Sequence, residues 1–193
     1  MNLVLIRHAR PLAVTAVEGR ADPSLSEEGH AQAARLATAL TALGVDALYS
    51  SPLQRTLETA APTVAATGLE VNVDKRLIEL DSELGQYARD DELSADSDLA
   101  AAYFSGDWSK ISSETPEQFV DRIRTTLDSI VHAHRGQTVA VFTHGGVISA
   151  WIACVVGADR FPIPWYLSDY GAMNRFVTQG ADRTRITALN ERP

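Results

Sequence analysis

Two short apolar runs constrain the fold of this chain more than any other feature. One covers residues 3–6 and the other covers 138–142, and neither alternates polar with apolar residues. Such a run is typical of a strand buried on both faces, in a sheet that helices cover on each side. Each run leads within two residues to a histidine, His8 and His144. Because ligands bind beyond the carboxyl ends of strands in such sheets, we expect both histidines to face a ligand site.

The remaining periodicity predicts an alternation of helices and further strands. Apolar residues at helical spacing, with capping residues around them, predict helices over 26–43, 53–67, 117–135 and 147–155. Shorter runs predict strands over 47–49, 69–73, 175–178 and 183–189. This order predicts an α/β fold of three layers, α/β/α, with a central, mostly parallel mixed sheet. No linker or repeat interrupts it, so we expect a single domain over residues 1–193.

Residues 80–115 depart from this alternation. They carry many acidic residues and scattered aromatic residues, and their periodicity is weak. Because a long irregular insertion in a compact domain is commonly functional, we predict a small, mainly helical cap over the strand ends. We expect its aromatic residues Tyr87, Phe104 and Trp108 to form the core of the cap rather than the walls of a substrate site. Trp151 is expected in the main core.

The composition limits the partners of the chain. Its formal net charge is −8 at pH 7 and no basic stripe is present, which argues against nucleic acid as a partner. A small phosphorylated ligand is still compatible, since a few converging arginines can outweigh the overall charge at short range. The single cysteine, Cys154, excludes an internal disulfide and a cysteine-built zinc site. Without a run of membrane-spanning length or the form of a signal peptide, we expect a cytoplasmic protein with no membrane partner.

Basic residues and free backbone N–H groups gather where the strands end. Arg7 immediately precedes His8, and Arg55 lies in the first turn of the helix after the second strand. His144 precedes two glycines at the start of another helix, where backbone N–H groups form an anion site. Arg55 alone would ordinarily be a solvated charge, because a cation is slightly disfavoured near a helix N-terminus. Its place beside a strand end favours a phosphate-binding role instead.

Four blocks stand in a fixed order along the chain. They read Arg-His-Ala, Ser-Pro-Leu-x-Arg-Thr-x-x-Thr-Ala, Leu-x-Glu and Thr-His-Gly-Gly, and they cover residues 7–9, 51–60, 77–79 and 143–146. A further stretch over 19–33 contains Gly-Arg-x-Asp-Pro and a later Gln-Ala pair. An Arg-His pair alone is weak evidence, but four ordered blocks are specific. Through them the chain resembles the histidine phosphatase superfamily, also called the phosphoglycerate mutase-like family.

The resemblance implies a phosphatase chemistry that uses neither a metal nor another cofactor. It implies that His8 attacks phosphorus and becomes a transient phosphohistidine. Arg7, Arg55 and His144 would bind the phosphoryl oxygens. Glu79 would protonate the leaving alkoxide and then deprotonate the attacking water, which requires a raised pKa. The other candidates for binding phosphate or substrate are Gly145, Arg10 and Arg20.

Two departures from the family pattern leave some roles open. Residues 10–11 are Arg-Pro where the family usually has Glu/Gln-Thr, and Val14 stands where many members place a phosphate-contacting asparagine. The roles of that loop therefore do not transfer. In addition, the glycine after Glu79 comes two residues later than in the commonest family spacing. Asp81 or Glu83 is therefore an alternative proton donor.

These observations predict a metal-independent phosphomonoesterase that acts on a small phosphorylated metabolite. A phosphoglycerate mutase is an alternative, although the short chain and the altered loop after His8 disfavour it. A phospho-ligand-binding module or a protein phosphatase module is a third possibility, against which the retained histidines, arginines and acid argue. The cap and the loop over 10–24 are expected to set specificity. The oligomeric state cannot be read from the sequence, and a homodimer is one expectation.

Overall fold

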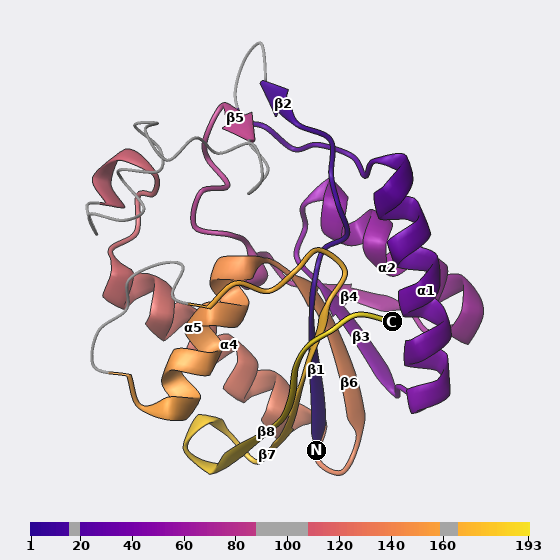
Figure 1. Ribbon diagram of the computed structural model, residues 1–193. Helices are drawn as coiled ribbons and strands as arrows, with labels where there is room; N and C mark the ends of the chain where they lie inside the picture. The colour runs from indigo at the N-terminus through magenta and orange to yellow at the C-terminus, as the bar shows by residue number, and fades with distance from the viewer. Residues whose placement is uncertain (16–19, 88–107, 159–165) are drawn as a thin grey trace.

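A six-stranded mixed sheet forms the centre of the protein (Figure 1). The computed structural model describes residues 1–15, 20–87, 108–158 and 166–193. From one edge to the other, the strands are β4 (Val71–Val73), β3 (Ala47–Ser50), β6 (Thr138–Thr143), β1 (Asn2–Arg7), β7 (Met173–Thr178) and β8 (Thr184–Glu191). The first four of these run parallel, whereas β7 and β8 each pair antiparallel to their neighbours. The predicted strands are confirmed, with β1 and β6 at the centre.

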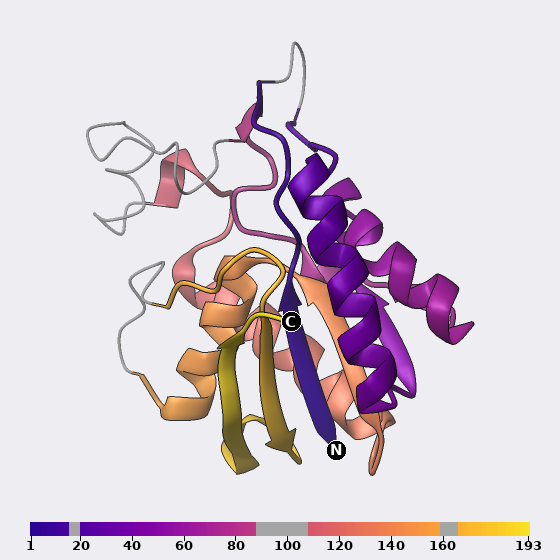
Figure 2. The ribbon, with the colours of Figure 1, turned by 45° about the vertical axis from the view of Figure 1, so that its right-hand side comes forward.

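Helices cover both faces of this sheet (Figure 2). The helices of one face are α1 (Glu27–Leu43) and α2 (Gln54–Thr67), and those of the other are α4 (Pro116–Ala133) and α5 (Gly145–Val156). Alternate residues of β1 explain this arrangement, because Leu3 and Leu5 pack in the cluster of α4 and α5 while Val4 and Ile6 pack in that of α1 and α2. Every residue of the run is buried. The predicted three-layer α/β/α fold is confirmed.

Local signals in the sequence explain where these helices begin and end. The Ser26 side chain accepts a hydrogen bond from the backbone N–H of Gly29, and α1 ends at Gly44 in the left-handed conformation. A capping box between Thr115 and Gln118 opens α4. The helix α5 begins at Gly145, two residues before the predicted start. The low helix propensity of glycine explains the difference, because it gives the two glycines no helix signal in the sequence.

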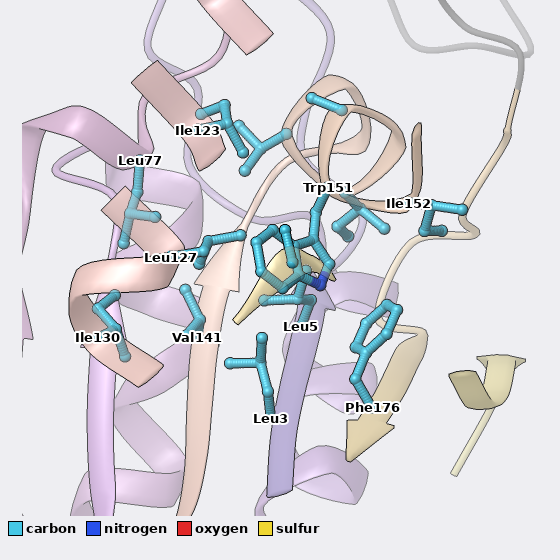
Figure 3. Close-up of a cluster of buried hydrophobic side chains, with 14 of the residues drawn as sticks. Leu3, Leu5, Leu77, Ile123, Leu127, Ile130, Val141, Trp151, Ile152 and Phe176 are labelled. Atoms are coloured by element: carbon cyan, nitrogen blue, oxygen red, sulfur yellow. The ribbon is translucent and has the colours of Figure 1, made fainter. Parts of the chain in front are cut away.

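The larger apolar cluster lies between the sheet and the helices α4 and α5 (Figure 3). Trp151 is fully buried there and makes an edge-to-face contact with Phe176 of β7, with ring centroids 6.5 Å apart. Trp108 is also buried and packs edge-to-face on Phe119 of α4. Trp151 therefore lies in the main core, as predicted, whereas Trp108, which was expected in the core of the cap, joins the same cluster because its ring packs on Phe119. This packing holds β6 and α5 together at the point where His144 joins them.

Short elements complete the described structure. The 3₁₀ turns are η1 (Lys75–Leu77), η2 (Trp108–Lys110) and η3 (Ala181–Arg183). Two-residue strands β2 (Val14–Thr15) and β5 (Gln86–Tyr87) pair antiparallel above the carboxyl end of β1 (Figure 1). The expectation of a loop over residues 10–24 did not include β2, because a two-residue strand has no detectable periodicity. Most of the predicted cap, with Phe104, lies outside the described residues. No described helix is long and apolar enough to cross a membrane.

Candidate active site

The two histidines that the sequence places after apolar strands lie side by side. β1 and β6 are parallel neighbours with Arg7 opposite Thr143. The backbone N–H of His8 donates to the carbonyl oxygen of Thr143 at 2.9 Å. The ring centroids of His8 and His144 are 5.3 Å apart, and both residues are buried. Their proximity thus follows from the pairing of the two most apolar runs in the chain.

The neighbours of His8 fix its protonation state. Its Nδ1 lies 2.9 Å from the carbonyl oxygen of Ala9, which can only accept, so Nδ1 carries the ring proton. The Nε of Arg55 donates to Nε2 of His8 at 3.2 Å, so Nε2 presents a lone pair. Burial, reinforced by the charges of Arg55 and Arg7, lowers the pKa of His8 well below its ordinary value. His8 is therefore neutral, and the nitrogen that carries its lone pair faces a guanidinium group.

Two buried arginines lie beside the histidines. Arg55, in the first turn of α2, is only 2% exposed, and its Nη1 is 3.7 Å from a carboxylate oxygen of Asp22. The same oxygen of Asp22 accepts from the backbone N–H of Gln54 at 2.9 Å, which ties the loop before α1 to the start of α2. Arg7 donates through Nη1 to the carbonyl oxygen of Ser168 at 2.6 Å. Both guanidinium groups are thus held at the carboxyl ends of β1 and β6, where the two histidines lie.

His144 leaves a polar atom available inside this cluster. Its Nε2 lies 2.8 Å from the hydroxyl of Ser51, whereas its Nδ1 is buried without a hydrogen-bond partner among the described residues. Within the same described part of the chain, Nη1 of Arg55 is likewise buried without a hydrogen bond. Burial, followed by the charge of Arg55, lowers the pKa of His144 well below its ordinary value, so the ring is neutral. Because buried polar atoms without partners are rare in proteins, these two indicate the place of a ligand.

Glu79 is fixed beside the start of α5 by two backbone donors. One carboxylate oxygen accepts from the N–H of Gly146 at 2.7 Å, and the other accepts from the N–H of Leu80 at 3.0 Å. Burial raises the pKa of Glu79 to about 7, with a further contribution from Asp81, although these two N–H bonds act in the opposite direction. A carboxyl group with this pKa can both give and take a proton near neutral pH.

The two alternative acids occupy less favourable positions. Glu83 is exposed, and Asp81 is half-buried in the turn that follows Glu79. The charge of Asp81 contributes to the raised pKa of Glu79. Glu79 accepts a hydrogen bond from the backbone N–H of Gly146 at the start of α5. The geometry therefore favours Glu79 as the acid of this cluster.

The three remaining candidates lie at different distances from the cluster. Gly145 is adjacent to Arg7, because a Cβ at this glycine would lie 3.5 Å from the Nε of Arg7. Arg10 is further out, with its guanidinium 6.0 Å from the ring centroid of Tyr170 and its Nε 3.4 Å from a carboxylate oxygen of Glu28. Arg20 is exposed. A role for Arg10 or Arg20 in substrate binding stays a prediction.

Two tyrosines that the sequence did not identify as site residues cover the cluster. The ring centroid of Tyr87 is 6.2 Å from that of His8, and the ring centroid of Tyr170 is 5.5 Å from it. The expectation that Tyr87 belongs to the core of a cap was wrong in this respect, because its short strand β5 carries it over the sheet edge. Tyr170 lies in a segment without periodicity, so no sequence signal marked it.

The cluster has the parts that phosphoryl transfer needs. It combines a neutral imidazole nitrogen with a lone pair, two guanidinium groups, a second neutral imidazole and a carboxyl group with a pKa of about 7. Phosphoryl transfer depends mainly on positioning and on the stabilisation of charge on three equatorial oxygens. No group of three or more histidine, cysteine, aspartate or glutamate side chains is placed to hold a metal ion within residues 1–15, 20–87, 108–158 and 166–193.

Comparison with known proteins decides the family. The model of the histidine phosphatase superfamily (branch 1) matches residues 3–192. The chain belongs to this superfamily. Phosphoserine phosphatase 1 of Hydrogenobacter thermophilus is 30% identical to it over 164 residues, which cover 82% of this chain and 78% of the relative. The resemblance inferred from the four sequence blocks is confirmed.

Other proteins similar to this chain carry different names. A probable phosphoglycerate mutase, GpmB of Erwinia tasmaniensis, is 26% identical over 162 residues, covering 81% of this chain and 75% of the relative. The solved structure of a mycobacterial glucosyl-3-phosphoglycerate phosphatase covers 100% of this chain, which in turn covers 99% of that structure. The TM-score is 0.77 at 23% identity. This similarity supports the fold, and the similar proteins carry the names of different enzymes.

Proposed function

We propose that the protein is a metal-independent phosphomonoesterase that hydrolyses a small phosphorylated metabolite through a phosphohistidine at His8. The observation that carries this proposal is that the His8 lone pair lies in one cluster with two buried atoms, Nδ1 of His144 and Nη1 of Arg55, that have no hydrogen-bond partner in the described part of the chain. A bound phosphoryl group would supply acceptors for donors of this kind. Phosphatase names among the relatives support the same reaction class.

Binding of the phosphoryl group would free the nucleophile. The Nε of Arg55 donates to the lone pair on Nε2 of His8. Phosphoryl oxygens would accept hydrogen bonds from Arg55 and Arg7, and Nε2 of His8 could then approach phosphorus. His144 would contribute a further donor, because the hydroxyl of Ser51 can donate to its Nε2 and so place the ring proton on Nδ1.

The reaction would proceed in two balanced steps. In the first, Nε2 of His8 forms a bond to phosphorus, the ester P–O bond breaks, and protonated Glu79 gives its proton to the leaving alkoxide. In the second, Glu79 takes a proton from water, whose oxygen attacks phosphorus, and the P–N bond breaks to release inorganic phosphate. The pKa of about 7 suits Glu79 to both steps.

A phosphoglycerate mutase is the alternative, since a relative that is 26% identical carries that name. A mutase must keep its phosphohistidine from water and return the phosphoryl group to the substrate. Direct assay of 2- and 3-phosphoglycerate interconversion separates the two functions. We expect hydrolysis to exceed interconversion. Faster interconversion would reverse the assignment.

The proposal is tested by hydrolysis of an aryl phosphate in the presence of EDTA. Wild-type protein is expected to be active under these conditions, and His8→Ala is expected to lose the activity. His132→Ala is the matched control, because His132 is exposed on α4. Retained activity in His8→Ala would remove His8 as the nucleophile, and loss of the wild-type activity with EDTA would contradict metal independence.

The remaining expectations concern partners and location. A small phosphorylated ligand is the proposed partner, in keeping with the converging arginines of the site. The cytoplasmic location and the homodimer stay predictions. Size-exclusion chromatography with light scattering measures the oligomeric state directly.

A further inference from the structure

A pair of tyrosines from distant parts of the chain lies beside His8. Tyr87 lies on β5, which pairs with β2 above the carboxyl end of β1 (Figure 1). Tyr170 immediately precedes Gly171, whose backbone N–H is shared between the carbonyl oxygens of Arg7 and His8, at 3.2 Å from each. The hydroxyl oxygens of the two tyrosines are 3.3 Å apart. A hydrogen bond between the hydroxyls therefore joins two rings whose centroids lie 6.2 and 5.5 Å from that of His8.

Each tyrosine ring also lies against one arginine of the site. The guanidinium carbon of Arg7 is 4.0 Å from the ring centroid of Tyr170, and that of Arg55 is 4.7 Å from the ring centroid of Tyr87. Contacts of this kind are attractive, and more so when water is excluded. The rings cover the faces of the guanidinium groups, so a phosphoryl group must bind to the N–H edges of the arginines. The hydroxyl of each ring, hydrogen-bonded to that of the other, is the polar group through which the pair can meet a leaving group.

The chemistry of these hydroxyls limits what they can recognise. Burial, together with Tyr170, raises the pKa of Tyr87 well above its ordinary value, so its hydroxyl stays neutral in the working range of the enzyme. A neutral phenol both donates and accepts hydrogen bonds. A leaving group with a hydroxyl next to the ester oxygen can replace the bond between the tyrosines. A plain alkyl group would break that bond without offering a hydrogen bond to either hydroxyl.

We propose that Tyr87 and Tyr170 select phosphomonoesters whose leaving group carries a hydroxyl beside the ester oxygen, as in a polyol or sugar phosphate. This inference rests on the proposed phosphomonoesterase function and adds a substrate class to it. A site built to hydrogen-bond a substrate hydroxyl discriminates against an analogue without it, because its own polar groups are then left unpaired. A single neutral hydrogen bond corresponds to a factor of about ten or less.

The test compares two esters with the same carbon chain, glycerol 1-phosphate and n-propyl phosphate. The measured quantity is the ratio of their kcat/KM values in wild-type protein, Tyr87→Phe and Tyr170→Phe. These variants keep the ring against the arginine and remove only the hydroxyl. We expect the ratio to fall about fivefold in each variant. Differences in leaving-group reactivity are common to all the proteins, so they cancel from this change.

Tyr49→Phe is the matched control, since the Tyr49 hydroxyl pairs with His134 at the end of α4. The ratio is expected to stay at the wild-type value in this variant, and melting temperatures verify that all the variants fold. A ratio within about twofold of wild type in both site variants would overturn the inference. An equal loss on the two esters would also overturn it, because the hydroxyls would then only support the arginines. If wild-type protein hydrolyses neither ester nor the aryl phosphate, the proposed function itself fails, which is a different result.

Discussion

Replacement of Gly146 by alanine should separate the proton-transfer role of Glu79 from the stability of the fold. Gly146 is the second residue of α5, and its N–H holds the carboxylate of Glu79 at 2.7 Å. A Cβ added there would lie 2.3 Å from one carboxylate oxygen and 3.0 Å from the carboxyl carbon. The carboxyl group must therefore move. The substitution should not lower the stability of the helix, because alanine is favoured over glycine in helices by up to about 1 kcal/mol.

The size of the expected loss follows from this displacement. The carboxylate oxygen at 2.3 Å must retreat by about 1 Å to reach an ordinary contact distance, which breaks its alignment with the leaving oxygen. A misplacement of about 1 Å can cost on the order of 100-fold in rate. We expect Gly146→Ala to lower kcat/KM for an alkyl phosphomonoester by about 100-fold, within the range assigned to general acid catalysis. An aryl phosphate should lose about tenfold or less, because a phenolate can leave without a proton.

The assay is steady-state hydrolysis of both esters, with the melting temperature measured on the same samples. Gly145→Ala is the neighbouring comparison, since a Cβ there would approach no atom closer than the Nε of Arg7 at 3.5 Å. It should therefore lose far less than Gly146→Ala on the alkyl ester. An equal loss on the alkyl and aryl esters, or a Gly146→Ala variant as active as wild type, would refute the placement of the acid at Glu79.

Three further predictions concern protonation, tautomer and packing. Because the pKa of Glu79 is raised from 4.5 to about 7, the folded protein keeps a proton between these pH values that the unfolded protein releases, so the stability of the wild-type protein falls as pH rises through this range. The melting temperature of Glu79→Gln relative to wild type should therefore increase from pH 5 to pH 8. A constant difference would contradict the raised pKa. Ser51→Ala removes the hydrogen-bond partner of Nε2 of His144, so it should lower kcat/KM by about tenfold and change the ¹⁵N chemical shifts of the His144 imidazole. Unchanged ¹⁵N shifts would show that Ser51 does not determine the tautomer of His144. Phe176→Ala should lower the free energy of unfolding, measured in urea, by about 3–5 kcal/mol. Val177→Ala, at an exposed position, should lower it by less than about 1 kcal/mol. Similar losses in the two variants would refute the packing of Phe176 in Figure 3.

The centre of the site could be predicted because local sequence determines it. An apolar run fixes β1 and β6 as buried neighbours, and whatever follows them in sequence must meet at the same edge of the sheet. His8 and His144 therefore come together without any knowledge of side-chain contacts. Arg55 is placed in the same way, by the short connection from β3 to α2. These residues required only strand periodicity, helix signals and the order of the motifs.

The periphery of the site could not be predicted because contacts between distant segments determine it. Tyr170 is placed by hydrogen bonds from Gly171 to the end of β1, more than 160 residues earlier in the chain. Tyr87 is placed by the pairing of two-residue strands, which are too short for a periodic pattern. The choice among acids was open for a similar reason, since the hydrogen bond between Glu79 and Gly146 joins residues that are 67 positions apart.

Trapping of the phosphorylated enzyme tests the central claim most directly. Protein mixed with an excess of a phosphomonoester and quenched in alkali within milliseconds is digested, and the phosphate is located by mass spectrometry. The account predicts an acid-labile, alkali-stable phosphoryl group on the peptide that contains His8, with a build-up that precedes steady-state release of phosphate. Phosphate on any other residue would contradict the account. The Glu79→Gln variant should slow hydrolysis of the intermediate, so the account would also be contradicted if both wild-type protein and this variant turned over substrate without any phosphorylated peptide.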